Sequence, residues 1–190
     1  VIAIGLRTDE YRRFEGKSIA EIALALGKNP YDALFDLLAA EKCEAGMIDY
    51  ISDEEDLKAI LRAPFSGVIS DATYPGAGQV HPRVYGAFAR LIETYVVREK
   101  VLTLEQAVHK VTLQAAERFS LAGKGKIEVG ADADLLLFAP EKIRERGTYL
   151  KPKACASGFD EVFVLGERVI ENGEYRGGSS GEMLGLRMEY

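Results

Sequence analysis

The spacing of apolar residues changes near residue 121, and this change limits the folds that the chain can adopt. Before it, short apolar runs alternate with segments whose apolar residues recur every three or four positions, as in a helix. After it, glycines separate short apolar runs. The first pattern is typical of strand–helix units around a parallel sheet, and the second indicates a β-rich segment. The sequence therefore predicts an α/β protein with a smaller β-rich part.

Local signals mark where the elements of the first part begin and end. Capping boxes start at Ser18, Ser52 and Thr103, where the first side chain and a Glu or Gln three residues later satisfy each other's backbone N–H groups. Pro30 opens a further helix, and Pro64 ends one. The expected helices cover residues 18–27, 30–46, 52–64, 84–100 and 103–119. The expected strands cover residues 1–6, 47–51 and 65–70.

Turn residues between short apolar runs predict the strands of the second part. A hairpin is expected to turn near Gly166-Glu167, and Asn172-Gly173 predicts the next turn. The expected strands cover residues 134–138, 159–165, 168–171 and 174–175, and the first of these has the composition of a buried strand. Residues 177–190 begin with Gly-Gly-Ser-Ser-Gly and are expected to form a flexible tail.

Charge and composition exclude two classes of partner. The 190 residues include 24 Lys and Arg against 30 Asp and Glu, a net charge of −6, and no basic cluster supplies the face that a nucleic-acid binder needs. No apolar run approaches the roughly 18 residues of a membrane-spanning helix. Cys43 and Cys155 are too few for a disulfide framework, and a reducing compartment suits them. We therefore expect a cytoplasmic protein that binds neither nucleic acid nor membranes.

Asp71 is the first candidate for a functional residue. It follows the run 65–70, which is apolar enough for a strand buried on both faces, and it precedes a Gly- and Pro-rich loop, 72–82. In βα sheets catalytic groups sit at the carboxyl ends of strands, where a carboxylate can take a proton from water and pass it to a leaving amine. The alternative is an aspartate that only caps the loop or the next helix.

His81 and Arg83 lie at the end of the same loop. A histidine there could bind a substrate carboxylate or a ring, and the arginine fork is suited to a carboxylate. An ion pair or a cap at the start of the next helix explains both residues equally well. His109, inside an expected helix with no Cys or His nearby, indicates only an exposed helical residue. The stretch Gly123-Lys124-Gly125-Lys126 lacks the spacing of a phosphate-binding loop.

Short motifs follow one another along nearly the whole chain. They are Glu15-Gly16-Lys17-Ser18-Ile19, Asn29-Pro30-Tyr31-Asp32-Ala33-Leu34, Val68-Ile69-Ser70-Asp71, His81-Pro82-Arg83-Val84-Tyr85-Gly86, Leu104-Glu105-Gln106-Ala107, Ala116-Glu117-Arg118-Phe119, Gly125-Lys126-Ile127 and Gly130-Ala131-Asp132-Ala133-Asp134-Leu135. This series resembles the C-terminal part of D-aminoacylases, or N-acyl-D-amino-acid deacylases, of the amidohydrolase superfamily. The order of the motifs is more specific than any one of them.

The resemblance implies the C-terminal part of a (β/α)8 barrel, formed by residues 1–120, and part of a small β-sandwich, formed by residues 121–176. Residues 47–51 and 65–70 would be the last two barrel strands. It also implies a zinc-dependent hydrolase of N-acyl amino acids, in which Asp71 moves the proton of the metal-bound water and is a weak metal ligand. His81 and Arg83 would lie near the substrate.

The chain departs from this family in two respects. A complete barrel needs about 250 residues, and the family's histidine ligands have no counterpart here, because only His81 and His109 occur. The chain also begins inside an apolar run without Met, so we expect a fragment that is inactive alone, associates through exposed strand edges and needs the N-terminal half of the barrel or another chain. The alternatives are a non-catalytic scaffold or interaction subunit and another amidohydrolase, such as a cyclic-amide hydrolase.

Overall fold

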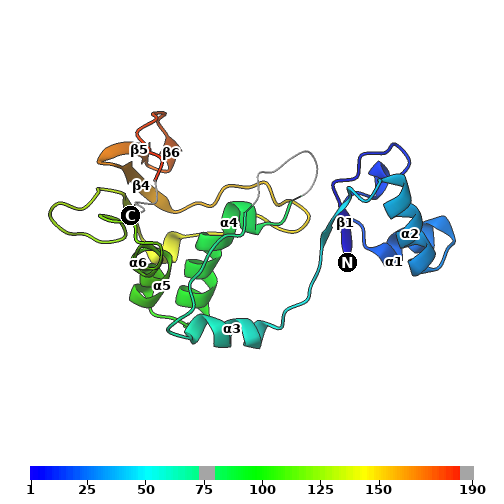
Figure 1. The fold of residues 1–190 in the computed structure, drawn as a ribbon, viewed down its shortest axis with the longest axis horizontal. Helices are drawn as coiled ribbons and strands as arrows, with labels where there is room; N and C mark the ends of the chain where they lie inside the picture. Colours follow the sequence, from blue (N-terminus) through cyan, green and yellow to red (C-terminus); the bar gives the residue numbers. More distant parts are fainter. Residues whose placement is uncertain (73–79, 185–190) are drawn as a thin grey trace, which may run out of the picture. The chain divides into compact units, whose positions relative to one another are not determined.

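The computed structural model describes residues 1–72 and 80–184, which form two compact units (Figure 1). The first unit contains the described residues of Val1–Asp53, Asp71–Tyr85 and Gly147–Ala154, and the second those of Glu54–Ser70, Gly86–Arg146 and Cys155–Tyr190. The domain boundaries expected from the sequence stay a prediction. Within the described residues, no helix is both long enough and apolar enough to cross a bilayer.

The first unit pairs a short two-stranded sheet with two helices. Strand β1 (Ile2–Ile4) pairs antiparallel with β2 (Gly46–Ile48), so that Ile2 lies opposite Ile48. Between them come the single turn η1 (Arg12–Phe14) and the helices α1 (Ile19–Leu26) and α2 (Pro30–Ala40). Buried residues of these elements and of the segment after β1 form one core, made of Ala3, Leu6, Tyr11, Phe14, Ile22 and Leu37.

The ends of α1 and α2 follow the local signals. The Ser18 hydroxyl accepts from the Glu21 N–H while the Glu21 carboxylate accepts from the Ser18 N–H, which confirms the first capping box. The Asn29 side chain caps α2 ahead of Pro30. Helix α2 ends at Ala40, not at residue 46 as expected, because Lys42 and Cys43 take the left-handed backbone conformation.

Two carboxylates satisfy the main chain where β1 ends. Glu15 accepts from the N–H groups of Gly5 and Leu6 at 2.9 and 2.8 Å. Glu41 accepts from the N–H groups of Arg7 and Thr8 at 2.9 and 3.1 Å. Four successive backbone donors, which no described strand pairs, are thus bound by side chains that follow η1 and α2.

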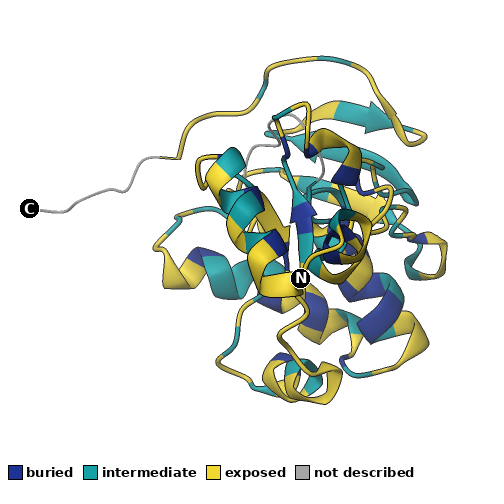
Figure 2. Cartoon of the chain, turned by 90° about the vertical axis from the view of Figure 1, so that its right-hand side faces the viewer, coloured by how far each residue is buried: buried dark blue, intermediate teal, exposed yellow. Residues whose placement is uncertain are grey.

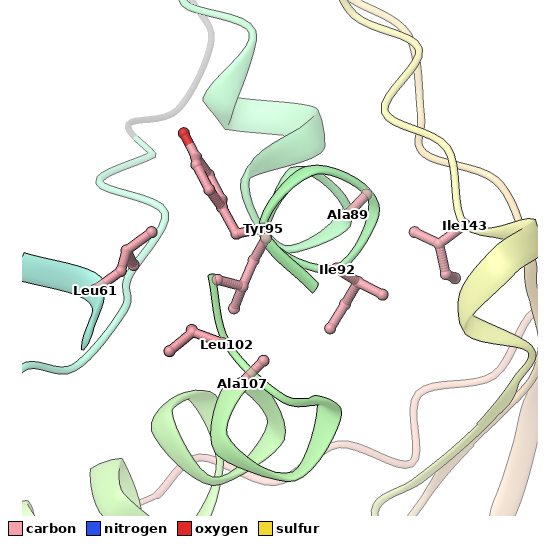
Figure 3. Packing of buried hydrophobic residues seen from close by; sticks show 8 residues of the cluster. Leu61, Ala89, Ile92, Tyr95, Leu102, Ala107 and Ile143 are labelled. Atoms are coloured by element: carbon pink, nitrogen blue, oxygen red, sulfur yellow. The ribbon is translucent and has the colours of Figure 1, made fainter. Parts of the chain in front are cut away.

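The second unit packs helices around a buried cluster. Its helices are α3 (Glu54–Arg62), most of α4 (Arg83–Arg90), the π-helix η2 (Leu91–Arg98), α5 (Leu104–Val111), α6 (Leu113–Arg118) and the single turn η3 (Pro140–Lys142). Figure 3 shows the cluster, to which α3 contributes Leu61, η2 contributes Ile92 and Tyr95, and the residue after η3 contributes Ile143. The Tyr95 hydroxyl donates to Glu54 at 2.7 Å, so this buried ring also satisfies its polar atom.

Two expected helices have the expected extent but a different internal structure. The segment expected at 84–100 is α4 followed by η2, whose π-type hydrogen bonds span five residues. The segment expected at 103–119 is α5 and α6, separated by Thr112, which has φ −127° and ψ −94°. The capping box at Thr103 is present. Helix α3 begins at Glu54, one residue later than a cap at Ser52 predicts.

The expectation of a strand at residues 65–70 is wrong. Residues 66–70 have no regular structure, and every strand pair among the described residues is antiparallel. An apolar run becomes a strand only when a neighbouring strand takes its hydrogen bonds, and no described strand does so here. The segment is instead held by Lys110 of α5, whose ammonium donates to the carbonyl oxygens of Ala63 and Ser66 at 2.6 and 2.8 Å.

The strands expected in the β-rich segment are present, and they form a meander. Strands β3 (Leu135–Phe138), β4 (Phe159–Val164), β5 (Glu167–Glu171) and β6 (Glu174–Tyr175) make one antiparallel sheet in that order. The turns at Leu165-Gly166 and Asn172-Gly173 have positive φ at both residues, as tight hairpin turns require.

The sheet differs from the expectation in its burial. Figure 2 shows that the helices carry both buried and exposed positions. Strands β3 to β6 contain no buried residue. Leu136 and Leu137 of β3 are 56% and 61% exposed, so the expectation of a buried strand there is wrong for this chain. The sequence shows that this strand is apolar, but it does not show which other element would have to pack against the strand to bury it.

Candidate functional site

All three site residues expected from the sequence lie in the first unit. Asp71 is exposed and has φ +46°, a left-handed conformation that aspartate adopts more readily than most residues. It does not follow a strand, since 65–70 forms none, so the expected strand-end position is wrong for this chain. Of the loop expected at 72–82, residues 73–79 lie outside the described residues.

Arg83, the first residue of α4, binds Asp71 through two atoms. Its Nη2 lies 2.6 Å from the Asp71 carboxylate, and its Nε donates to the Asp71 carbonyl oxygen at 3.2 Å. Both side chains are well exposed, at 44% and 67%, so the pair contributes little to stability. Its main effect is geometric, because the planar guanidinium fixes both the carboxylate and the backbone of Asp71.

His81 makes the second connection at this site. Its Nδ1 accepts from the Arg83 backbone N–H at 3.0 Å. A nitrogen that accepts carries no proton, so this geometry assigns the neutral ring with its proton on Nε2. The N–H of a first helical residue has no partner within the helix, and His81 supplies one. The cap and ion pair considered as an alternative are therefore present, and they join the three candidate residues to one another.

Two tyrosines that the sequence did not single out line this site. The Tyr149 ring lies 5.2 Å from the His81 ring at 86°, and 5.0 Å from the Tyr50 ring at 62°. Both arrangements are edge-to-face contacts, which aromatic rings favour. Tyr50 follows β2, and Tyr149 comes from a segment without helix or strand. No local sequence signal marks either residue, because the contact exists only in the folded chain.

The site does not contain a complete metal centre. The described residues hold no group of three His, Cys, Asp or Glu side chains that could bind an ion, whereas a catalytic zinc normally has three protein ligands. His109, on α5 of the second unit, is exposed. The residues present therefore do not fit a zinc site by themselves, and Asp71 could supply one ligand at most.

The Gly123-Lys124-Gly125-Lys126 stretch has a structural role. The Lys124 ammonium lies 3.0 Å from Asp132 and 2.6 Å from Asp134. The hydrogen bond to Asp134 raises the pKa of Lys124 most, and the hydrogen bond to Asp132 raises it further. Asp134 also accepts from the Leu165 N–H at the turn between β4 and β5. A pocket of about 390 Å³ beside this stretch is lined in part by Lys124, whose charge is thus already compensated.

Comparison with known proteins gives consistent results. The sequence model of the amidohydrolase family matches residues 8–169. The D-aminoacylase of Alcaligenes xylosoxydans xylosoxydans is 32% identical over 174 residues, which cover 92% of this chain and 35% of that protein. A crystal structure of D-aminoacylase, described as defining a novel subset of amidohydrolases, matches with a TM-score of 0.80 at 30% identity, over 93% of this chain and 36% of that one.

A second solved structure is an N-acyl-D-glutamate deacylase from Bordetella bronchiseptica, complexed with zinc and a phosphonate inhibitor that mimics the tetrahedral intermediate. It matches with a TM-score of 0.79 at 32% identity, over 88% of this chain and 34% of that one. The chain thus spans about a third of the length of the relatives it matches. The expected fold class, part of the fold of a metal-dependent amidohydrolase, is confirmed, and the chain belongs to the amidohydrolase family.

Proposed function

We propose that the protein containing this chain hydrolyses the amide bond of N-acyl-D-amino acids, and that Asp71 moves the proton in this reaction. The observation that carries the proposal is the connection of Asp71, Arg83 and His81 within one unit. The similarity to D-aminoacylase and to N-acyl-D-glutamate deacylase supports the reaction type and the substrate class.

Each of the three residues has a defined task in this proposal. The Asp71 carboxylate takes a proton from the attacking water and returns it to the nitrogen of the leaving D-amino acid. Arg83 holds Asp71 in place and offers its guanidinium to the carboxylate of the substrate, for which its planar fork is suited. His81 lies two residues before Arg83 and accepts from its backbone N–H. In this proposal its ring contacts the substrate beside the guanidinium.

The metal and the rest of the fold would come from outside the described residues. We propose zinc as the metal, because the related N-acyl-D-glutamate deacylase is complexed with it. The described residues hold no group of three possible ligands, so we propose that this chain's own contribution is proton transfer and substrate binding. The partner would be the remainder of the barrel, in the same protein or in another chain. Cys43 and Cys155 are both free thiols, which suits a cytoplasmic location.

The test is the Asp71→Asn variant of the full-length protein. The amide keeps the size of the side chain but cannot accept a proton, so kcat for release of the D-amino acid should fall at least about 100-fold. Asp9→Asn is the matched control, because Asp9 is an exposed aspartate of the same unit, and its kcat should be unchanged. Undiminished turnover in Asp71→Asn would exclude the proposed role.

A further inference from the structure

The segment that carries Tyr149 is a rigid turn. The Thr148 N–H donates to the Lys151 carbonyl at 3.0 Å, and the Lys151 N–H donates to the Thr148 carbonyl at 3.1 Å. The Thr148 hydroxyl oxygen also accepts from the Lys151 N–H at 3.0 Å. Three hydrogen bonds therefore close a turn of four residues, and Tyr149 projects from it with its backbone fixed.

The base of this turn packs against the residue that follows His81. A Cβ atom on Gly147 would come within 2.9 Å of the Pro152 carbonyl oxygen, so the close approach of these two backbone segments favours glycine. The same Cβ would lie 3.5 Å from Pro82 Cβ, at an ordinary contact distance. Pro82 and Pro152 are both buried. The base of the turn therefore lies beside the His81-Pro82 segment.

The His81 ring is consequently held from two directions. The Tyr149 ring meets it edge-to-face, with centroids 5.2 Å apart, while its Nδ1 accepts from the Arg83 N–H at 3.0 Å. Tyr149 is itself held against Tyr50, with ring centroids 5.0 Å apart. A ring with a packing contact and a hydrogen bond loses most of its rotational freedom, so its orientation is set before any ligand arrives.

We propose that Tyr149 is a positioning residue, which holds the His81 imidazole in the orientation that binds substrate. This inference rests on the proposed function, because it assumes that His81 contacts the substrate. Since His81 acts in binding and Asp71 in proton transfer, loss of the Tyr149 ring should weaken binding and leave the chemical step intact. A phenylalanine at this position keeps the ring contact with His81 and should therefore keep substrate binding.

The experiment is a kinetic double-mutant cycle in the full-length protein, with an N-acyl-D-amino acid as substrate. Tyr149→Ala should raise KM about tenfold with kcat within about twofold of the parent, and Tyr149→Phe should restore KM to within about twofold. In a His81→Ala background, Tyr149→Ala should raise KM no further, since its effect passes through His81. Tyr31→Ala, which removes an exposed ring of α2 in the same unit, should leave KM unchanged.

The outcomes separate this inference from the proposed function. If Tyr149→Ala leaves KM unchanged, if the phenylalanine variant behaves like the alanine variant, or if the effects of His81→Ala and Tyr149→Ala on KM multiply, the positioning role is wrong. If His81→Ala itself leaves KM unchanged, the substrate-binding role of His81 in the proposed function is wrong. Circular dichroism and the thermal midpoint of each variant show whether a raised KM reflects unfolding. If Tyr149→Ala is unfolded, Tyr149→Leu replaces it in the comparison with Tyr149→Phe. Tyr149→Leu should then raise KM as expected for Tyr149→Ala.

Discussion

Glu41 shows how a single side chain can fix the path of a distant segment. It is only 4% exposed, and it accepts from the Thr8 hydroxyl at 2.5 Å as well as from two backbone N–H groups. Burial raises the pKa of Glu41, but the hydrogen bonds from Thr8 and Arg7 outweigh it, and the pKa is lowered overall. Folding thus stabilises the ionised form of the Glu41 carboxylate.

We predict that Glu41 contributes stability that acid removes. Because its pKa is lower in the folded than in the unfolded chain, the contribution is complete above about pH 4.3, the usual pKa of a free glutamate, and is lost as the pH falls through the lowered value. Glu41→Gln should lower the free energy of unfolding at pH 7 by about 1–3 kcal/mol and reduce the acid dependence. Urea unfolding at pH 3–7 measures both. Glu10→Gln, at an exposed position of the same unit, is the control, and equal pH profiles for Glu41→Gln and the parent would contradict the prediction.

Lys110 has a comparable role in the second unit. It is 5% exposed, and its ammonium donates to two carbonyl oxygens and to the Ser66 hydroxyl oxygen. We predict that Lys110→Met lowers the free energy of unfolding by about 2–3 kcal/mol, because it removes three hydrogen bonds made by a buried ammonium group. Lys126→Met, which removes only an exposed pair with Glu128, should cost less than about 1 kcal/mol. Denaturant unfolding compares the two variants. Equal losses in the free energy of unfolding would show that the buried Lys110 contributes no more to stability than the exposed Lys126.

At the scale of elements, helix α5 depends on its first turn. Thr103 accepts from the Gln106 N–H at 3.2 Å, and Gln106 accepts from the Thr103 N–H at 2.9 Å. We predict that Thr103→Ala lowers the free energy of unfolding by about 1 kcal/mol, while Thr103→Ser, which keeps the hydroxyl, changes it little. Thermal unfolding of both variants measures the difference. A loss in the serine variant as large as in the alanine variant would assign the effect to the methyl group.

Elements whose signals are local could be predicted from the sequence, and elements whose partners are distant could not. The caps of α1 and α5 rest on neighbouring residues, and both are confirmed. The turn expected near Gly166-Glu167 also rests on neighbouring residues, and it occurs one residue earlier, at Leu165-Gly166. The apolar run 65–70 was wrongly expected to be a strand, because sequence composition does not show whether a pairing strand exists. The π-type hydrogen bonds of η2 were also missed, since a shift from four to five residues leaves the apolar spacing almost unchanged.

The same distinction applies to the site at the scale of the whole molecule. Asp71, His81 and Arg83 lie close together in the sequence, and their proximity in the structure was expected. Tyr149 joins them from a segment far along the chain, and only the folded structure brings it to His81. The sequence contains only two histidines, and the described residues hold no group of three His, Cys, Asp or Glu side chains that could bind a metal ion. The roles of the three site residues stay predictions.

We predict that the 190-residue chain by itself neither retains zinc nor releases D-amino acids. A lone aspartate cannot hold a catalytic zinc, and the described residues offer no group of three ligands. Isothermal titration with zinc and a D-amino-acid release assay test this, with the full-length protein as the positive control. One equivalent of zinc retained after dialysis would show that the chain assembles a complete site alone.

The two units interleave along the chain, and this restricts how the protein can be shortened. The core of the first unit is built from Val1–Asp53, but His81, Arg83 and Tyr149 are supplied by two later segments that return to the same unit. A truncated protein that ends at Asp53 would keep that core and lose every residue of the candidate site except Tyr50. Trimming from either end cannot isolate the site, so a minimal version would require new connections between its three segments.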